Sequence, residues 1–290
     1  MQNFQEYIDS CTVSRLALGK SGAAVYELTD DRIAKYVCRQ DMADAEKWAS
    51  YQNEAAFYAA HMESALPFLP QVLHCHATQD EVQMIMRRYW PLDRAALDDA
   101  MLDKVMAVLA QIHRLPAGEA PASRQMDDAH IAQCVEGWRA VLAEHGDAFS
   151  AEGVEHVARC INDMNRCLHS GRVCRCHGDF HVENLLTDEQ GNIVVCDWQS
   201  TRPGHPAADI AFFLSRLEAD GCGFDRMRVV EMYCRHAKDI APQEIDAQMR
   251  LADVNTTFEF WHYFLHGATE DTVRKIYEPM LRNARQLMGE

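Results

Sequence analysis

The first ninety residues alternate between apolar and polar positions with the two-residue period of half-buried β-strands. A strand, a glycine-containing turn and a second strand are predicted over residues 16–28, and another strand over 33–37. A hairpin is predicted over 72–86. The period lengthens to that of a helix only over residues 46–62, where apolar side chains recur every three or four positions. The pattern therefore predicts a small β-rich region that carries one amphipathic helix.

Beyond Pro91 the apolar positions keep a helical period over most of the chain. Helices are predicted over residues 97–112 and 150–171, the second with Ser150 as its N-cap and Gly171 at its end. A short segment of strands and loops is expected over 173–206. The residues after it, 209–290, are again helical in pattern.

The change of period divides the chain into two lobes, and the fold class expected is α+β. Residues 1–90 form a predicted N-terminal lobe, and residues 91–290 form a larger helical lobe, with a linker near 87–92. We expect the smaller lobe to bind a ligand and the larger one to contribute the chemistry described below.

Composition and charge exclude several classes of function. The chain of 290 residues has 28 Lys and Arg against 44 Asp and Glu, a formal net charge of −16. This charge argues against nucleic-acid binding, because phosphates need an excess of cations, and it favours a cationic ligand. No apolar run reaches the length of about 20 residues needed to cross a bilayer, and the N-terminus lacks a secretory pattern. We expect a cytoplasmic protein with no membrane partner; nothing in the sequence indicates an oligomeric state.

The eleven cysteines are interpreted as reduced thiols, because their number is odd and no export signal accompanies them. Cys174-Arg175-Cys176-His177 places two thiols and an imidazole close together in the sequence. No second pair of Cys or His residues follows at the spacing of a zinc site. We therefore interpret this cluster as structural.

One stretch of the chain carries a pattern typical of phosphoryl transfer. It begins with His177-Gly178-Asp179 and continues to Asn184; an apolar strand over 193–195 then leads to Asp197. The segment between Asn184 and Asp197 contains a turn sequence, so a hairpin should bring these two side chains together. Their oxygens suit Mg²⁺, which takes few protein ligands beside phosphates and water. Asp179 would orient the attacking hydroxyl and accept its proton.

The order H-x-D-x-x-x-x-N over residues 177–184, followed by a strand and Asp197-Trp198, resembles the aminoglycoside phosphotransferase and choline kinase superfamily. This resemblance extends more thinly from Leu16 to Leu217. It implies a two-lobed protein-kinase-like fold, ATP or GTP with Mg²⁺ as cofactors, and a small molecule with a hydroxyl group as acceptor. Trp198-Gln199 replaces the Phe-Gly of protein kinases, and no A-P-E follows, which argues against a protein kinase switched by phosphorylation.

The resemblance also implies roles for residues of the N-terminal lobe. Lys35, in a strand, would hold the nucleotide phosphates, and Glu54, in the helix, would hold Lys35. The remaining nucleotide contacts that the resemblance implies are Gly19, Ser21 and Gly22 in a turn over the phosphates, with Met86 and Arg88 beside the base. His177 is interpreted as a brace for the loop, and Asp209 as a helix cap or a second brace.

The acceptor is the least determined part of the prediction. Within the motif, His181 and Glu183 are candidate substrate contacts, and the aromatic segment 256–264 adds Glu259 and Trp261. The activity expected is that of an aminoglycoside phosphotransferase. Two alternatives remain: a kinase of the same superfamily acting on choline, ethanolamine or a sugar, or a nucleotide-binding module that has lost catalysis.

Overall fold

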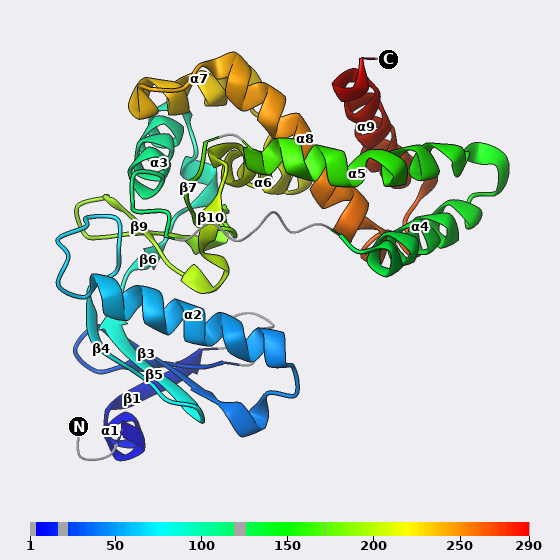
Figure 1. Cartoon of the computed structure of the whole chain (residues 1–290). Coiled ribbons are helices and arrows are strands. Elements are labelled where there is room, and N and C mark those ends of the chain that lie inside the picture. Colours follow the sequence, from blue (N-terminus) through cyan, green and yellow to red (C-terminus); the bar gives the residue numbers. More distant parts are fainter. Residues whose placement is uncertain (1–3, 17–22, 119–125, 171, 290) are drawn as a thin grey trace. The chain divides into compact units, whose positions relative to one another are not determined.

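A computed structural model describes residues 4–16, 23–118, 126–170 and 172–289 (Figure 1). The chain forms two compact units. Unit 1 comprises Met1–Val108 and His177–Thr201, and unit 2 comprises Leu109–Cys176 and Arg202–Glu290. The lobes predicted from the sequence are each continuous, whereas unit 1 also takes in a later segment of the chain, because strands of that segment pair with residues 90–91.

Unit 1 is built on a five-stranded antiparallel sheet with the order β1-β2-β3-β5-β4. Its strands are β1 (Thr12–Leu16), β2 (Ala24–Leu28), β3 (Arg32–Cys38), β4 (Val72–Ala77) and β5 (Glu81–Arg87). The first strand begins at Thr12, four residues before the start predicted at Leu16, and pairs with β2. Residues 17–22, over which that strand was predicted to continue into a turn, lie outside the described residues. The central strand β3 places Ala34 and Val37 in the core.

The helix predicted after β3 is α2 (Ala45–His61), which packs against β4 and β5 (Figure 1). Asp44 caps it by accepting hydrogen bonds from the amides of Glu46 and Lys47. Its buried face includes Tyr51 and Tyr58, as the periodicity predicted. The apolar face therefore fixes which side of α2 meets the sheet.

A short N-terminal helix, α1 (Phe4–Cys11), was not predicted from the sequence. Its buried side chains are Phe4 and Ile8, which lie one turn apart and pack against Leu28 and Ile85 of the sheet, with Tyr7 and Cys11 partly buried beside them. A helix of eight residues is too short to form by its own propensity, so tertiary packing decides it.

A second, three-stranded sheet supports the motif residues. Its order is β6-β8-β9, formed by β6 (Trp90–Pro91), β8 (Leu185–Thr187) and β9 (Ile193–Val195). The predicted turn between β8 and β9 is present: the Asp188 carboxylate accepts hydrogen bonds from the amides of Gln190 and Asn192. Asn184 and Asp197 therefore flank one hairpin, as expected.

Unit 2 is mainly helical, with one two-stranded ribbon. Its elements are α4 (Asp128–Ala143), α5 (Glu152–Ser170), β7 (Cys174–Cys176), β10 (Arg202–Gly204), α6 (Pro206–Ala219), α7 (Arg226–Ala237), α8 (Pro242–Phe260) and α9 (Glu270–Met288); the boundary with unit 1 falls within α3 (Asp99–Ile112). This confirms the α+β class. Over the ranges given above, none of the helices is long and apolar enough to cross a membrane.

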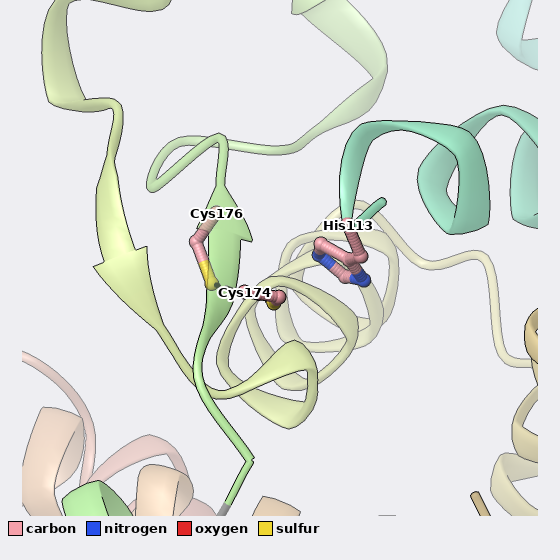
Figure 2. A group of neighbouring side chains, drawn as sticks. All are labelled: His113, Cys174 and Cys176. Carbon is pink, nitrogen blue, oxygen red and sulfur yellow. Dashed lines mark hydrogen bonds between the residues drawn. The ribbon is translucent and has the colours of Figure 1, made fainter. Parts of the chain in front are cut away.

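The thiols of Cys174 and Cys176 lie in the core of unit 2 beside His113, which follows α3 (Figure 2). The two sulfurs are 3.8 Å apart. Both nitrogens of the His113 ring already have partners, the Tyr233 hydroxyl at 2.8 Å and Asp209 at 3.1 Å. These hydrogen bonds satisfy the His113 imidazole. His177, the imidazole that the sequence grouped with the two cysteines, belongs to unit 1.

Asp209 was predicted to be either a helix cap or a second brace, and the structure excludes the first role. The N-cap of α6 is His205, which accepts a hydrogen bond from the amide of Ala207. Asp209 lies in the first turn and is 1% exposed, held by His113. It is therefore not the helix cap.

Candidate active site

The strand lysine and the helix glutamate predicted from the sequence meet in unit 1. Lys35 on β3 donates a hydrogen bond to Glu54 on α2, with 2.7 Å between Nζ and Oε2. Their side chains are only 13% and 2% exposed, so the pair is almost shielded from water. The Lys35 ammonium also lies 5.1 Å from the centre of the Tyr51 ring, a cation–π contact.

The charge state of this pair follows from its burial and its partners. Burial alone would lower the pKa of Lys35, but Glu54 and Asp197 outweigh it and raise that pKa above its ordinary value. Burial raises the pKa of Glu54, and the contact with Lys35 opposes this effect. Lys35 is therefore a fixed cation, suited to bind an anion such as a phosphate.

Asp197 lies at the end of β9 and faces Lys35. Its Oδ1 is 3.6 Å from the Lys35 Nζ, and the same oxygen is buried and accepts no hydrogen bond. The Asp197 backbone has φ +63°, in the left-handed region that a non-glycine residue adopts at an energetic cost. Such a conformation beside an unsatisfied carboxylate oxygen is typical of a functional position.

The motif loop joins Asp179 to Asn184. The side-chain nitrogen of Asn184, Nδ2, donates to the Asp179 backbone carbonyl at 2.8 Å and to the Asp179 carboxylate oxygen Oδ2 at 3.3 Å. The Asn184 carbonyl accepts hydrogen bonds from Cys196, the residue before Asp197. His181 Nε2 lies 3.6 Å from the other Asp179 oxygen, Oδ1. One network of contacts thus runs from Asp179 through Asn184 to the backbone beside Asp197.

Asp179 is held in its ionised form. Burial raises its pKa, but the hydrogen bond and charge of His181 and the hydrogen bond from the Asn184 side-chain amide lower it by more, so that the pKa of Asp179 lies below its ordinary value of 3.8. The side chain keeps 38% of its surface exposed. An ionised, accessible carboxylate can orient a hydroxyl and accept its proton.

His177 braces the loop, as the sequence predicted. It is fully buried, and its Nε2 lies 3.0 Å from the Cys196 carbonyl while its Nδ1 accepts from the Asp179 amide. Gly178, the residue between His177 and Asp179, has φ +83°, and a Cβ there would lie 2.2 Å from the Ser200 carbonyl oxygen. Only glycine fits this position, because both the backbone angle and the close approach exclude a side chain.

Replacing Gly178 by alanine should destabilise the fold by about 3 kcal/mol, since a left-handed alanine costs ~1–2 kcal/mol and the overlap adds a similar amount. Gly191→Ala is the matched control: φ there is +75°, but nothing lies within 4 Å of an added Cβ. Urea unfolding of both variants measures the difference. Equal losses of stability would contradict the close approach at Gly178.

The residues predicted to contact the nucleotide are only partly described. Gly19, Ser21 and Gly22 lie outside the described residues. Met86 is half-buried on β5, where it pairs with Ile33 and Val72.

Arg88 forms an ion pair with Glu27, and its amide donates to the Asp31 carbonyl. That amide is therefore already used within the protein and is not available as a donor to the base.

The predicted substrate residues fall into two groups. His181 lies beside Asp179, and Glu183 is 60% exposed, 3.5 Å from Arg94. In unit 2, Glu259 is largely buried, with 3.2 Å between its Oε1 and His130 Nε2.

Trp261 is half-buried at the start of the helical turn η6 (Trp261–Tyr263). The aromatic side chains that face solvent in this segment are Phe260, Tyr263 and Phe264.

Several residues of the site were not anticipated from the sequence. Tyr51 contacts the Lys35 ammonium, Arg94 contacts Glu183, and Asn53 and Trp198 join α2 to the segment after Asp197. The apolar period marked Tyr51 only as a core residue. Asn53 is the residue before Glu54, but it lies on the exposed face of α2. An exposed polar residue carries no sequence signal of its own.

A comparison with protein families finds a match that spans most of the chain. The family described as the phosphotransferase enzyme family (APH) matches residues 12–247. The chain therefore belongs to this family and is a phosphotransferase. No curated protein matches the sequence.

Solved structures share the fold over nearly the whole chain. The ADP-bound aminoglycoside phosphotransferase APH(2'')-Ib is 16% identical with a TM-score of 0.61, covering 98% of each chain. A thermostable mutant of APH(4)-Ia is 15% identical, with a TM-score of 0.60 and complete coverage of both chains. The choline kinase LicA from Streptococcus pneumoniae is 15% identical, with a TM-score of 0.58 over 99% of this chain and 98% of its own. At these identities the likeness concerns the fold alone.

Proposed function

We propose that this phosphotransferase transfers the terminal phosphoryl group of ATP or GTP to a hydroxyl group of a small molecule. The observation that supports it most directly is the buried contact between Lys35 and Glu54, with Asp197 3.6 Å from the Lys35 ammonium. This is the arrangement that the kinase reaction requires, because the lysine holds the nucleotide phosphates and the aspartate holds the metal. Solved relatives that contain ADP and GDP support a nucleotide as the donor.

Asp197 and Asn184 would hold the Mg²⁺ ion that accompanies the nucleotide. The donor set fits, because both side chains offer the hard oxygens that Mg²⁺ prefers, and the buried Asp197 Oδ1 accepts no hydrogen bond within the protein. When bound, the ion would neutralise charge on the phosphates. Lys35 would hold those phosphates, and Glu54 would keep the Lys35 ammonium in place.

Asp179 would act on the acceptor. As an ionised carboxylate that is part-exposed, it would orient the attacking hydroxyl and take its proton at Oδ1 or Oδ2. The Asn184 amide on Oδ2 limits rotation of the carboxylate, and His181 lies beside Oδ1. Catalysis would then come mainly from positioning and from charge neutralisation.

The acceptor we propose is a cationic small molecule, as an aminoglycoside is. The net charge of −16 supports a positively charged ligand. The names of the solved relatives include both aminoglycoside phosphotransferases and choline kinases, whose acceptors all carry amino or quaternary ammonium groups. Choline or ethanolamine is therefore the alternative acceptor; Glu183, Glu259 and Trp261 remain candidate contacts for either.

The decisive test measures release of nucleoside diphosphate by the purified chain with Mg-ATP or Mg-GTP. The acceptors are a panel of aminoglycosides, choline, ethanolamine, amino alcohols and neutral sugars. We expect turnover with at least one cationic acceptor and none without an acceptor beyond slow hydrolysis. Turnover only with neutral sugars would contradict the cationic acceptor. A thermal shift with Mg-nucleotide but no turnover with any acceptor would indicate a nucleotide-binding module that has lost catalysis. Neither a shift nor turnover would contradict the proposed function.

A further inference from the structure

Helix α2 and the segment after Asp197 are linked by hydrogen bonds from residues that have no proposed role in the phosphoryl transfer. The Asn53 side-chain nitrogen donates to the backbone carbonyls of Gln199 at 2.9 Å and Thr201 at 3.0 Å. The hydroxyl of Ser50, one turn earlier on α2, lies 3.2 Å from the Gln199 side-chain oxygen. One face of α2 thus binds the helical turn η5 (Trp198–Ser200) and the residue after it.

An aromatic stack adds to this connection. The ring of Phe57 on α2 lies 4.2 Å from that of Trp198, with 12° between the two planes. Trp198 is fully buried, and its indole nitrogen donates to the Val195 carbonyl at 2.9 Å. The tryptophan is therefore held by β9 and stacks on α2, and it is the residue that directly follows Asp197.

The position of these contacts along the chain gives them a consequence for the site. Asn53 precedes Glu54 on α2, and Trp198 follows Asp197, so each linking residue is the neighbour of a residue that contacts Lys35. A movement of α2 away from η5 would separate Glu54 from Asp197 and leave Lys35 with one partner. The contacts that hold these three charged groups together are all made by side chains and backbone of the protein itself.

We propose that Asn53 is a positioning residue that, together with the Phe57–Trp198 stack, keeps Glu54 and Asp197 assembled around Lys35 before the nucleotide binds. This inference rests on the proposed function for its kinetic consequence. An enzyme assembled in advance does not use nucleotide binding energy to bring α2 into place. When only a fraction of the molecules is assembled, the apparent affinity for the nucleotide falls by that fraction, whereas turnover at saturation is retained.

The test compares Asn53→Ala with Gln52→Ala. Gln52 is the preceding residue of α2 and also donates its side-chain amide to a backbone carbonyl, that of Thr78 at 2.7 Å, in the turn between β4 and β5. The control therefore loses the same kind of hydrogen bond from the same helix, away from η5. Asn53 is exposed, so Asn53→Ala should still fold, which circular dichroism and thermal unfolding verify.

For Asn53→Ala we expect the KM for Mg-nucleotide to rise about tenfold, the effect of losing two modest hydrogen bonds, with kcat within about twofold of wild type. Gln52→Ala should leave both constants unchanged. Hydrogen–deuterium exchange without nucleotide gives a second readout: amides of residues 45–61 and 196–201 should exchange faster in Asn53→Ala than in Gln52→Ala. Trp198→Phe, which keeps an aromatic ring for the stack, should change KM less than Asn53→Ala does.

The outcomes separate this inference from the proposed function. If the wild-type chain neither binds nor turns over Mg-nucleotide, the proposed function fails, and the exchange experiment alone decides whether Asn53 holds α2. If the wild type is active and Asn53→Ala shows the same KM and the same exchange as Gln52→Ala, the positioning role is wrong. A lower melting temperature with unchanged KM would also overturn it, because Asn53 would then support only the fold.

Discussion

Asp179→Asn is expected to lower kcat by about 10²–10⁴-fold, the usual contribution of a general base, and to change the Kd for Mg-nucleotide by less than about threefold. The replacement has almost the same shape, and its side-chain carbonyl can still accept the Asn184 amide that now bonds to Oδ2. What it removes is the negative charge that receives the proton. Turnover with the best acceptor and nucleotide titration by calorimetry measure the two effects separately.

The matched control for this variant is Asp30→Asn. Asp30 is an exposed turn residue of unit 1 with φ +69°, a conformation that asparagine also adopts readily. It should show wild-type kcat. A loss of nucleotide affinity in Asp179→Asn equal to the loss of kcat would contradict the proposal, because it would indicate a damaged fold and not a missing base.

The pH dependence of the reaction gives a further check on Asp179. Its pKa is lowered in the folded protein, so the carboxylate is present above its ordinary value of 3.8 and is lost only as the pH falls below that value. Asp179 therefore stays ionised between pH 6 and 8, and its protonation cannot lower kcat in that range. A limb in that range would belong to another group, such as an amine of the acceptor.

The sequence predicted those parts of the site whose position depends on neighbouring residues alone, through a strand period, a helical period or a turn sequence. The strand period placed Lys35 on β3, the helical period placed Glu54 on α2, and the turn sequence before Asn192 implied a hairpin with Asn184 and Asp197 at its two ends. Each prediction needed only the residues within one or two neighbouring elements. The pairing of Lys35 with Glu54 came from the family resemblance, and the structure places them 2.7 Å apart.

The parts that the sequence did not predict depend on contacts between distant residues. Asn53 and Gln199 are 146 positions apart, and His113 and Asp209 are 96 apart. No period or turn signal links such residues, because their contact is decided by how whole elements pack. Arg88 shows the same limit: its place after β5 was predicted, but not that the Asp31 carbonyl would take its amide.

Asp197→Asn is expected to abolish most of the Mg-dependent activity, with kcat/KM reduced by at least about 10³-fold, since a metal ion supplies several kcal/mol of charge stabilisation and each 1.36 kcal/mol is tenfold in rate. The amide keeps the size of the side chain but loses the charge that attracts both Lys35 and a divalent cation. Because Asp197 Oδ1 accepts no hydrogen bond, the substitution leaves no protein donor at that oxygen unpaired, and the variant should fold. Titration with Mg²⁺ at fixed nucleotide should show a large rise in the concentration needed for half-maximal binding.

Glu189→Gln is the control that separates the charge of Asp197 from charge in general. Glu189 lies in the turn of the same hairpin and is also paired with a cation, Arg87, at 3.1 Å, but it is exposed. The two variants change the net charge of unit 1 by the same amount. Glu189→Gln should retain wild-type Mg²⁺ dependence, because a solvent-exposed pair contributes little and no nucleotide site is expected there. If the Mg²⁺ dependence of Asp197→Asn equals that of Glu189→Gln, Asp197 does not hold the metal, and the kinase assignment of this site is wrong.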